Sequence, residues 1–152
     1  MSGLAPLTAA EIKDMAIVWY RKLDIHAPLE EYKELLASEG LEMVFPEGTQ
    51  KGWEGYTGWY NTVINLFFDE VHTVEKVEPT INGTEADVEV VVKWEASFWN
   101  KPDAYTKRIV AHAYQTWKVI RDAESGKPVV LTYVVDDIKY EDGSATLDEI
   151  KA

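Results

Sequence analysis

The sequence predicts an α+β fold, because segments with helical periodicity come first and long alternating segments typical of antiparallel strands follow. A length of 152 residues fits one domain that is large enough to bury a core. Hydrophobic residues make up 46% and charged residues 28%, which excludes disorder over most of the chain. We expect one domain at residues 8–141, an N-terminal arm at 1–7 and a polar C-terminal tail at 142–152.

Three helices are expected in the first part of the chain. The first, at residues 9–23, begins at a capping box formed by residues 8–11, and apolar residues then recur at helical spacing. Pro28 suits the first position of a second helix. A short strand at 41–45 and a glycine-rich loop follow, and residues 56–67 then carry the apolar pattern of a third helix.

Four long strands are expected after the helices. The segment 71–81 leads into the hairpin turn Asn82-Gly83, and residues 86–99 alternate between apolar and polar side chains. The last two strands are expected at 107–121 and 129–140. Strands in this order pair as antiparallel neighbours, which completes the prediction of an α+β architecture.

The charge balance excludes several classes of partner. With 15 basic and 27 acidic residues the net charge is −12, so neither nucleic acid nor an anionic membrane surface is an expected partner. No apolar run approaches the roughly 20 residues that span a bilayer. The N-terminus has no basic or apolar region of a signal peptide, and we therefore expect a cytoplasmic protein.

Neither a metal nor a cofactor is expected. Cysteine is absent, which excludes disulfides, a thiol nucleophile and zinc thiolate sites. The three histidines do not have the spacing of metal ligands. The glycines at 48–58 precede no Gly-Lys-Ser/Thr sequence and do not follow a strand of a βαβ unit, so they match no nucleotide-binding loop.

The residues at 8–11, 52–54, 59–60, 67–72 and 117–135, in this order of helices and strands, resemble the nuclear transport factor 2-like superfamily. That superfamily includes ketosteroid isomerases, SnoaL-like polyketide cyclases and scytalone dehydratase. The resemblance implies a cone-shaped, curved antiparallel sheet wrapped around the three helices, also called a cystatin-like fold. It further implies an apolar pocket with one open mouth.

The resemblance and the strand alternation together predict which side chains line this pocket. The expected occupant is a small hydrophobic molecule, since aromatic and apolar walls suit such a ligand. The expected ligand-binding residues are Trp19, Phe45, Tyr56, Tyr60, Trp94, Gln115, Trp117, Tyr133 and Val135.

The pattern of a ketosteroid isomerase is only partly present. The resemblance implies an aspartate base just before Pro46, but Phe45 stands there and cannot carry a proton. Trp19 and Gln115 stand where that family has its two oxyanion donors, and the supporting tyrosine is retained as Tyr60. We therefore do not expect ketosteroid isomerase activity.

Two other residues are candidates for moving a proton. The Asp136-Asp137 pair ends the last strand, where some SnoaL-like cyclases carry an acid/base aspartate, and alternation selects Asp137 as the member facing the pocket. His112 lies in the middle of a strand but shares its register with outward-facing residues. The other histidines, His26 and His72, are expected at the surface.

The residues leave two main hypotheses for function. The first is an enzyme that isomerises, cyclises or dehydrates a hydrophobic substrate, and the second is a non-catalytic ligand-binding or dimerisation module. A protein-transport adaptor has no support beyond the fold. A homodimer is expected through the outer face of the sheet, which carries Val91, Val110, Tyr114 and Ile120.

Overall fold

The computed structural model describes residues 4–151 and places the helices ahead of the long strands. In this described part no helix is long and apolar enough to cross a membrane. In chain order the elements are α1 (Ala9–Asp24), the 3₁₀-helix η1 (Leu29–Leu35), β1 (Glu42–Phe45), β2 (Gly48–Lys51), α2 (Gly52–Leu66), β3 (Phe68–Asn82), β4 (Glu85–Phe98), β5 (Lys107–Arg121), β6 (Pro128–Tyr140) and the 3₁₀-helix η2 (Leu147–Glu149).

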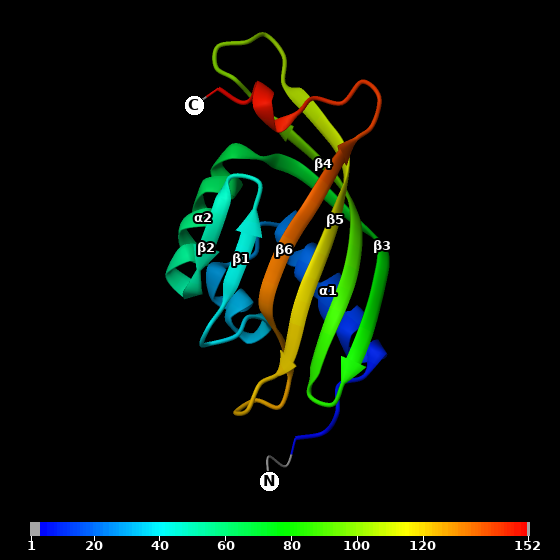
Figure 1. Ribbon diagram of the computed structural model, residues 1–152. Coiled ribbons are helices and arrows are strands. Elements are labelled where there is room, and N and C mark those ends of the chain that lie inside the picture. The colour runs from blue at the N-terminus through cyan, green and yellow to red at the C-terminus, as the bar shows by residue number, and fades with distance from the viewer. Residues whose placement is uncertain (1–3, 152) are drawn as a thin grey trace.

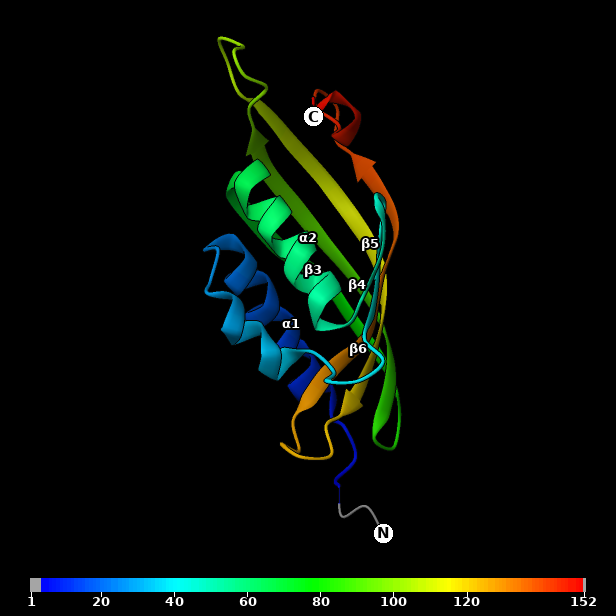
Figure 2. The ribbon, with the colours of Figure 1, turned by 90° about the vertical axis from the view of Figure 1, so that its left-hand side faces the viewer.

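The strands within residues 4–151 form one sheet in the order β2-β1-β6-β5-β4-β3. Neighbouring strands are antiparallel except for β1 and β6, which run parallel. Figure 1 shows that the strands β3 to β6 are long and curved. Figure 2 shows α1, η1 and α2 together on one side of this sheet. The predicted α+β class, with a curved sheet wrapped around N-terminal helices, is therefore confirmed.

The first half of the chain differs from the prediction in two places. The second helix is the 3₁₀-helix η1, whose buried residues Tyr32 and Leu35 are three apart, the repeat of a 3₁₀-helix rather than of an α-helix. Part of the glycine-rich loop is the strand β2, which forms a hairpin with β1. The helix α2 then begins at Gly52, directly after this hairpin.

A β-bulge in β6 changes which side chains face inward. The predicted alternation is present in β4 and β5, where Gln115 is buried and its neighbours Tyr114 and Thr116 are exposed. In β6, however, Gln115 pairs with Val135 while Tyr114 pairs with Asp137, so Asp136 is an extra residue. The extra residue inverts the alternation beyond it. The prediction that Asp137 faces the pocket is therefore wrong, and its side chain is exposed.

His112 also lies on the outer face of the sheet. Its ring nitrogens contact two carboxylates, with Nδ1 2.6 Å from Glu75 Oε1 and Nε2 2.8 Å from Glu141 Oε2. The hydrogen bonds to Glu75 and Glu141 raise the pKa of His112, because they favour the protonated ring. Both ring nitrogens therefore contact carboxylates on the outer face of the sheet, and not on the face that the helices cover. The candidate role of His112 in catalysis is therefore not supported by its position.

The segment after β6 folds back along the sheet. The backbone N–H of Ala145 donates to the carbonyl of Arg108, and the buried amide of Asn100 donates to the carbonyl of Glu149. Leu147 and Ile150 pack against a small second hydrophobic cluster. Figure 2 places this segment beyond the end of β6, on the side of the sheet that carries α2. The residues expected to form a polar tail thus contribute apolar contacts.

Arg121 fastens the N-terminal arm to the sheet. Its side chain is only 7% exposed, and its guanidinium donates to both carboxylate oxygens of Glu11 at 2.8 and 3.0 Å. It also donates to the carbonyls of Ala5, Pro6 and Gly126. The hydrogen bond from Arg121 lowers the pKa of Glu11 from 4.5 to about 2. One side chain thus joins the arm, the start of α1 and the end of β5.

Glu11→Gln is expected to remove a pH-dependent part of the stability. Because the pKa of Glu11 is lowered in the folded state, its contribution is present above pH 4.5 and is lost as the pH falls towards about 2. At pH 7 the free energy of unfolding of the variant should be about 1 kcal/mol lower than that of the wild type. The glutamine can still complete the capping box, so that contribution is retained. Urea unfolding at several pH values measures the difference, and the exposed Glu30→Gln is the control. A constant difference from pH 7 to pH 2 would contradict this.

Candidate active site

A cavity of about 100 Å³ lies between α1, α2 and the concave face of the sheet. It reaches the surface beside Pro46 and Glu47, which are both exposed. Its walls are largely aromatic and aliphatic, as in a site for a small apolar molecule. The lining residues are Tyr20, Leu23, Phe45, Pro46, Glu47, Trp59, Tyr60, Val63, Ile64, Phe67, Glu70, His72, Val92, Trp94, Ala113, Gln115, Tyr133, Val135, Ile138 and Leu147.

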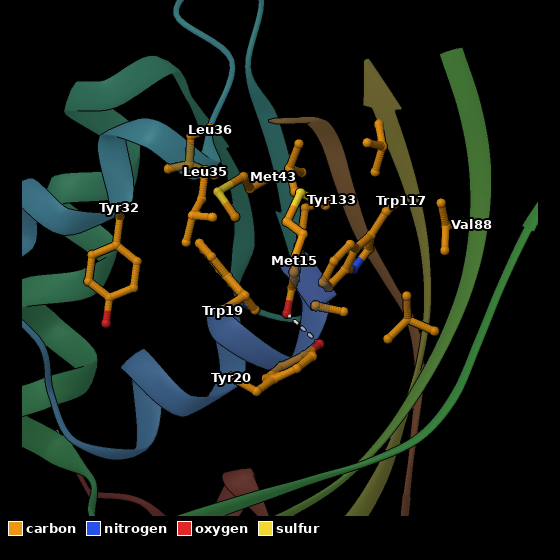
Figure 3. Packing of buried hydrophobic residues seen from close by; sticks show 14 of the residues in the cluster. Met15, Trp19, Tyr20, Tyr32, Leu35, Leu36, Met43, Val88, Trp117 and Tyr133 are labelled. Atoms are coloured by element: carbon orange, nitrogen blue, oxygen red, sulfur yellow. Dashed lines mark hydrogen bonds between the residues drawn. The ribbon is translucent and has the colours of Figure 1, made fainter. Parts of the chain in front are cut away.

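The structure places the residues predicted to bind a ligand in two layers. The cavity itself is lined by Phe45, Tyr60, Trp94, Gln115, Tyr133 and Val135. The other three, Trp19, Tyr56 and Trp117, are buried behind this wall. Trp19, for example, is 1% exposed and packs edge-on against Tyr32 and at an angle against Tyr133. Figure 3 shows Trp19 among core residues.

Gln115 holds the buried polar network behind the cavity. Its Oε1 accepts hydrogen bonds of 3.0 Å from the Tyr20 hydroxyl and from the Trp117 indole N–H. An indole N–H can only donate, so the amide oxygen must lie on this side and the amide N–H₂ on the other. The Tyr133 hydroxyl lies 3.2 Å from that of Tyr20. A dashed line in Figure 3 marks this contact. The network therefore fixes the Gln115 amide as a donor at the cavity wall.

Burial keeps the tyrosines of this network neutral. Desolvation raises the pKa of Tyr133 to about 12 and that of Tyr20 well above its usual value. Each phenol thus keeps its proton across the physiological pH range and serves as a hydrogen-bond donor. Neither tyrosine can act as a proton acceptor there. A proton acceptor for catalysis must come from another lining residue.

The imidazole of His72 is one of the lining residues that can accept a proton, and Asp24 holds it in place. The His72 Nδ1 lies 2.6 Å from Asp24 Oδ1, and the His72 backbone N–H donates to Oδ2 at 3.2 Å. A carboxylate only accepts, so Nδ1 carries a proton, and in the neutral ring the free lone pair is therefore on Nε2. Among residues 4–151 no hydrogen bond to Nε2 is present, and the ring stacks on Tyr20 with a centroid distance of 5.0 Å. An oriented imidazole beside an apolar cavity is the arrangement of a general base.

The prediction that His72 lies at the surface is wrong, since its side chain is 9% exposed. One signal in the sequence pointed to its partner. Asp24 is the last residue of α1, where the negative end of the helix dipole disfavours a carboxylate. An acidic residue in this position does not stabilise its own helix, which indicates that the carboxylate interacts with a partner outside the helix.

A second carboxylate, Glu70, also lines the cavity. Its side chain is 8% exposed, its Oε1 accepts from the Trp94 indole at 3.2 Å, and its Oε2 lies 2.8 Å from His26 Nε2. Together with the Asp24 pair, this makes two carboxylate–histidine contacts between the end of α1 and the start of β3. Neither contact could be predicted from the sequence, because the paired residues are 44 and 48 positions apart.

Phe45, which stands where the resemblance implies an aspartate base, is part of the wall. Its ring stacks on Trp59 with a centroid distance of 4.1 Å and an interplanar angle of 3°. Phe45 itself cannot move a proton. The titratable lining residues other than the tyrosines are Glu47, Glu70 and His72.

Comparison with known proteins supports the fold alone. No protein-family model matches the chain, and no curated protein matches it significantly. Among solved structures, a protein from Novosphingobium aromaticivorans that is provisionally named an aromatic ring hydroxylase is 14% identical, with a TM-score of 0.75 over 92% of this chain and 94% of that one. The hexachlorocyclohexane dehydrochlorinase LinA-type3 from Novosphingobium barchaimii is 16% identical, with a TM-score of 0.70 over 91% and 92%.

A third similar structure carries the name of the fold. It is a nuclear transport factor 2-like superfamily protein from Salmonella enterica, 16% identical, with a TM-score of 0.67 over 91% of this chain and 92% of that one. The chain thus has the nuclear transport factor 2-like fold, in agreement with the resemblance seen in its sequence.

Proposed function

We propose that the protein is an enzyme that uses His72 as a general base to remove a proton from carbon and then eliminates water from a small, largely apolar molecule. The observation that carries this proposal is the His72–Asp24 pair at the wall of an apolar cavity. A binding module needs apolar walls and hydrogen-bond donors, but it has no need of an imidazole oriented by a carboxylate. The arrangement therefore favours the enzyme over the non-catalytic module.

The proposed reaction balances without a cofactor. The Nε2 of His72 takes the proton from a carbon next to a carbonyl group or an aromatic ring, and the imidazolium is stabilised by Asp24. The carbon–oxygen bond of a hydroxyl on the adjacent carbon then breaks. The departing hydroxyl receives the proton from Nε2 and leaves as water, which restores the neutral histidine and leaves a carbon–carbon double bond. The Gln115 amide is the donor available to the substrate oxygen.

The lining favours water as the leaving group. Within residues 4–151 no lysine or arginine lines the cavity, so an anionic leaving group has no permanently charged cation beside it. A leaving group that departs as a neutral molecule avoids this cost. The similar structure that is named a dehydrochlorinase is by its name an elimination enzyme, which supports the reaction class.

The experiment that tests the proposal uses a nitrobenzisoxazole, a flat molecule whose ring opens when a base removes its carbon-bound proton. The proton passes to the base, the nitrogen–oxygen bond breaks, and a coloured cyanonitrophenolate forms. His72→Gln should lower the second-order rate constant by about 100-fold or more, the usual contribution of a general base. His112→Gln removes a histidine from the outer face and should retain the wild-type rate. Equal rates for wild type and His72→Gln would refute the proposal.

A further inference from the structure

Glu70 is a carboxylate built into the wall of the cavity. It follows Asp69, where a β-bulge lies between Phe68 and Val71 and the backbone adopts a left-handed conformation with φ +51°. Arg108 donates to the carbonyl of Asp69 at 2.6 Å and so holds this bulge in place. A bulge redirects the side chains next to it, and here Glu70 is among the residues that line the cavity.

The hydrogen bonds of Glu70 leave part of its accepting capacity unused. A carboxylate offers about four acceptor positions, and the Trp94 indole N–H occupies one of them. His26 Nε2, on the loop after α1, contacts the other oxygen. Within residues 4–151 no further hydrogen bond reaches the carboxylate, so a bound molecule that donates a hydrogen bond can use the remaining positions.

Apart from histidine, the charged residues that line the cavity have one sign. Glu47 and Glu70 are both lining residues, and none of the lining residues in the described chain is a lysine or an arginine. An anion in this cavity would face a carboxylate in surroundings where charge–charge repulsion is weakly screened. A neutral molecule with a hydroxyl group can instead donate a hydrogen bond to the Glu70 carboxylate.

We propose that Glu70 determines substrate specificity by accepting a hydrogen bond from a hydroxyl group of a neutral substrate and by repelling anionic analogues. The inference rests on the proposed function, because it names the class of molecule on which His72 would act. It adds that the substrate is an uncharged, hydroxylated molecule of about one aromatic ring. The size follows from the cavity of about 100 Å³, which is open at Glu47.

The test measures binding rather than catalysis, with phenol, anisole and benzoate as probes. These share one ring and differ in carrying a hydroxyl donor, a methyl ether or a negative charge. Titrations are followed by the indole N–H signals of the tryptophans in proton–nitrogen correlation spectra, with the Trp94 signal assigned by Trp94→Phe. Wild type should bind phenol at least about tenfold more tightly than anisole, the effect of one hydrogen bond to a charged acceptor. Benzoate should bind most weakly.

Glu70→Gln keeps the shape of the side chain and removes its charge, so the preference for phenol over anisole should fall to about twofold and benzoate binding should strengthen. Glu47→Gln removes the other lining carboxylate, at the exposed mouth, and should keep the wild-type preference. His26→Gln leaves Glu70 in place and should also keep the wild-type preference for phenol over anisole. Unchanged selectivity in Glu70→Gln, or its loss in His26→Gln alone, would overturn the inference.

The two proposals fail in different ways. If wild type binds phenol and anisole equally well, Glu70 does not select the hydroxyl, and the role of His72 as a base stands untouched. If wild type binds none of the probes while His72→Gln also leaves the nitrobenzisoxazole rate unchanged, both the proposed function and the role of Glu70 are refuted.

Discussion

Asp24→Asn is expected to lower the rate constant for opening of the nitrobenzisoxazole by about 100-fold or more, although the imidazole itself is retained. In the wild type the two oxygens of Asp24 accept from His72 Nδ1 and from the His72 backbone N–H. The backbone N–H can only donate, so it will form its hydrogen bond with the single amide oxygen of the asparagine. The amide N–H₂ then faces Nδ1, and it can be accommodated only if the histidine proton moves to Nε2. The lone pair that faces the substrate is thereby lost.

This mechanism can be measured apart from the rate. Nitrogen chemical shifts of the imidazole should report a proton on Nδ1 in the wild type and on Nε2 in Asp24→Asn. Asp14→Asn is the matched control, because it removes the same charge from an exposed position on the same helix. It should change neither the tautomer nor the rate. A fall in rate without a change of tautomer would show that Asp24 acts through its charge, by stabilising the imidazolium, and not through the tautomer.

The fold could be predicted from the sequence because its signals are local. The capping box at the start of α1, the alternation along β4 and the hairpin turn Asn82-Gly83 each determine a nearby conformation. The superfamily resemblance then related these elements to one another. The inward positions of Gln115 and Tyr133 follow from the same alternation.

The candidate site was harder to predict because it depends on irregularities and on contacts between distant residues. One extra residue in β6 turns Asp137 outward, and nothing in the alternation of that strand reveals it. His72 becomes a candidate base only through Asp24, which is 48 positions away in the sequence. Glu70 reaches the cavity from a bulge at the start of β3. Side-chain periodicity predicts which face of the sheet a residue occupies in a regular strand, but not where the hydrogen-bond register shifts.

Gln115→Leu is expected to destabilise the protein by about 1–3 kcal/mol, although the volume of the side chain hardly changes. Gln115 Oε1 is the acceptor for both the Trp117 indole and the Tyr20 hydroxyl, and all three side chains are buried. Leucine removes the acceptor and leaves the indole N–H without a partner. The Tyr20 hydroxyl can turn to Tyr133, which limits the loss. The cost is thus that of one unpaired buried donor, the Trp117 indole N–H, and not of a cavity.

Urea unfolding of Gln115→Leu and of Thr116→Val measures this cost against a neighbour on the opposite face of β5. Thr116 is exposed and donates to Asp136 at 2.7 Å, so removing its hydroxyl should change the free energy of unfolding by no more than about 0.5 kcal/mol. Similar values for the two variants would contradict the network described for Gln115. A large loss in Gln115→Leu alone would show that the amide stabilises the buried tyrosine and tryptophan, and that any contribution of Gln115 to binding must be measured in a variant that keeps its oxygen.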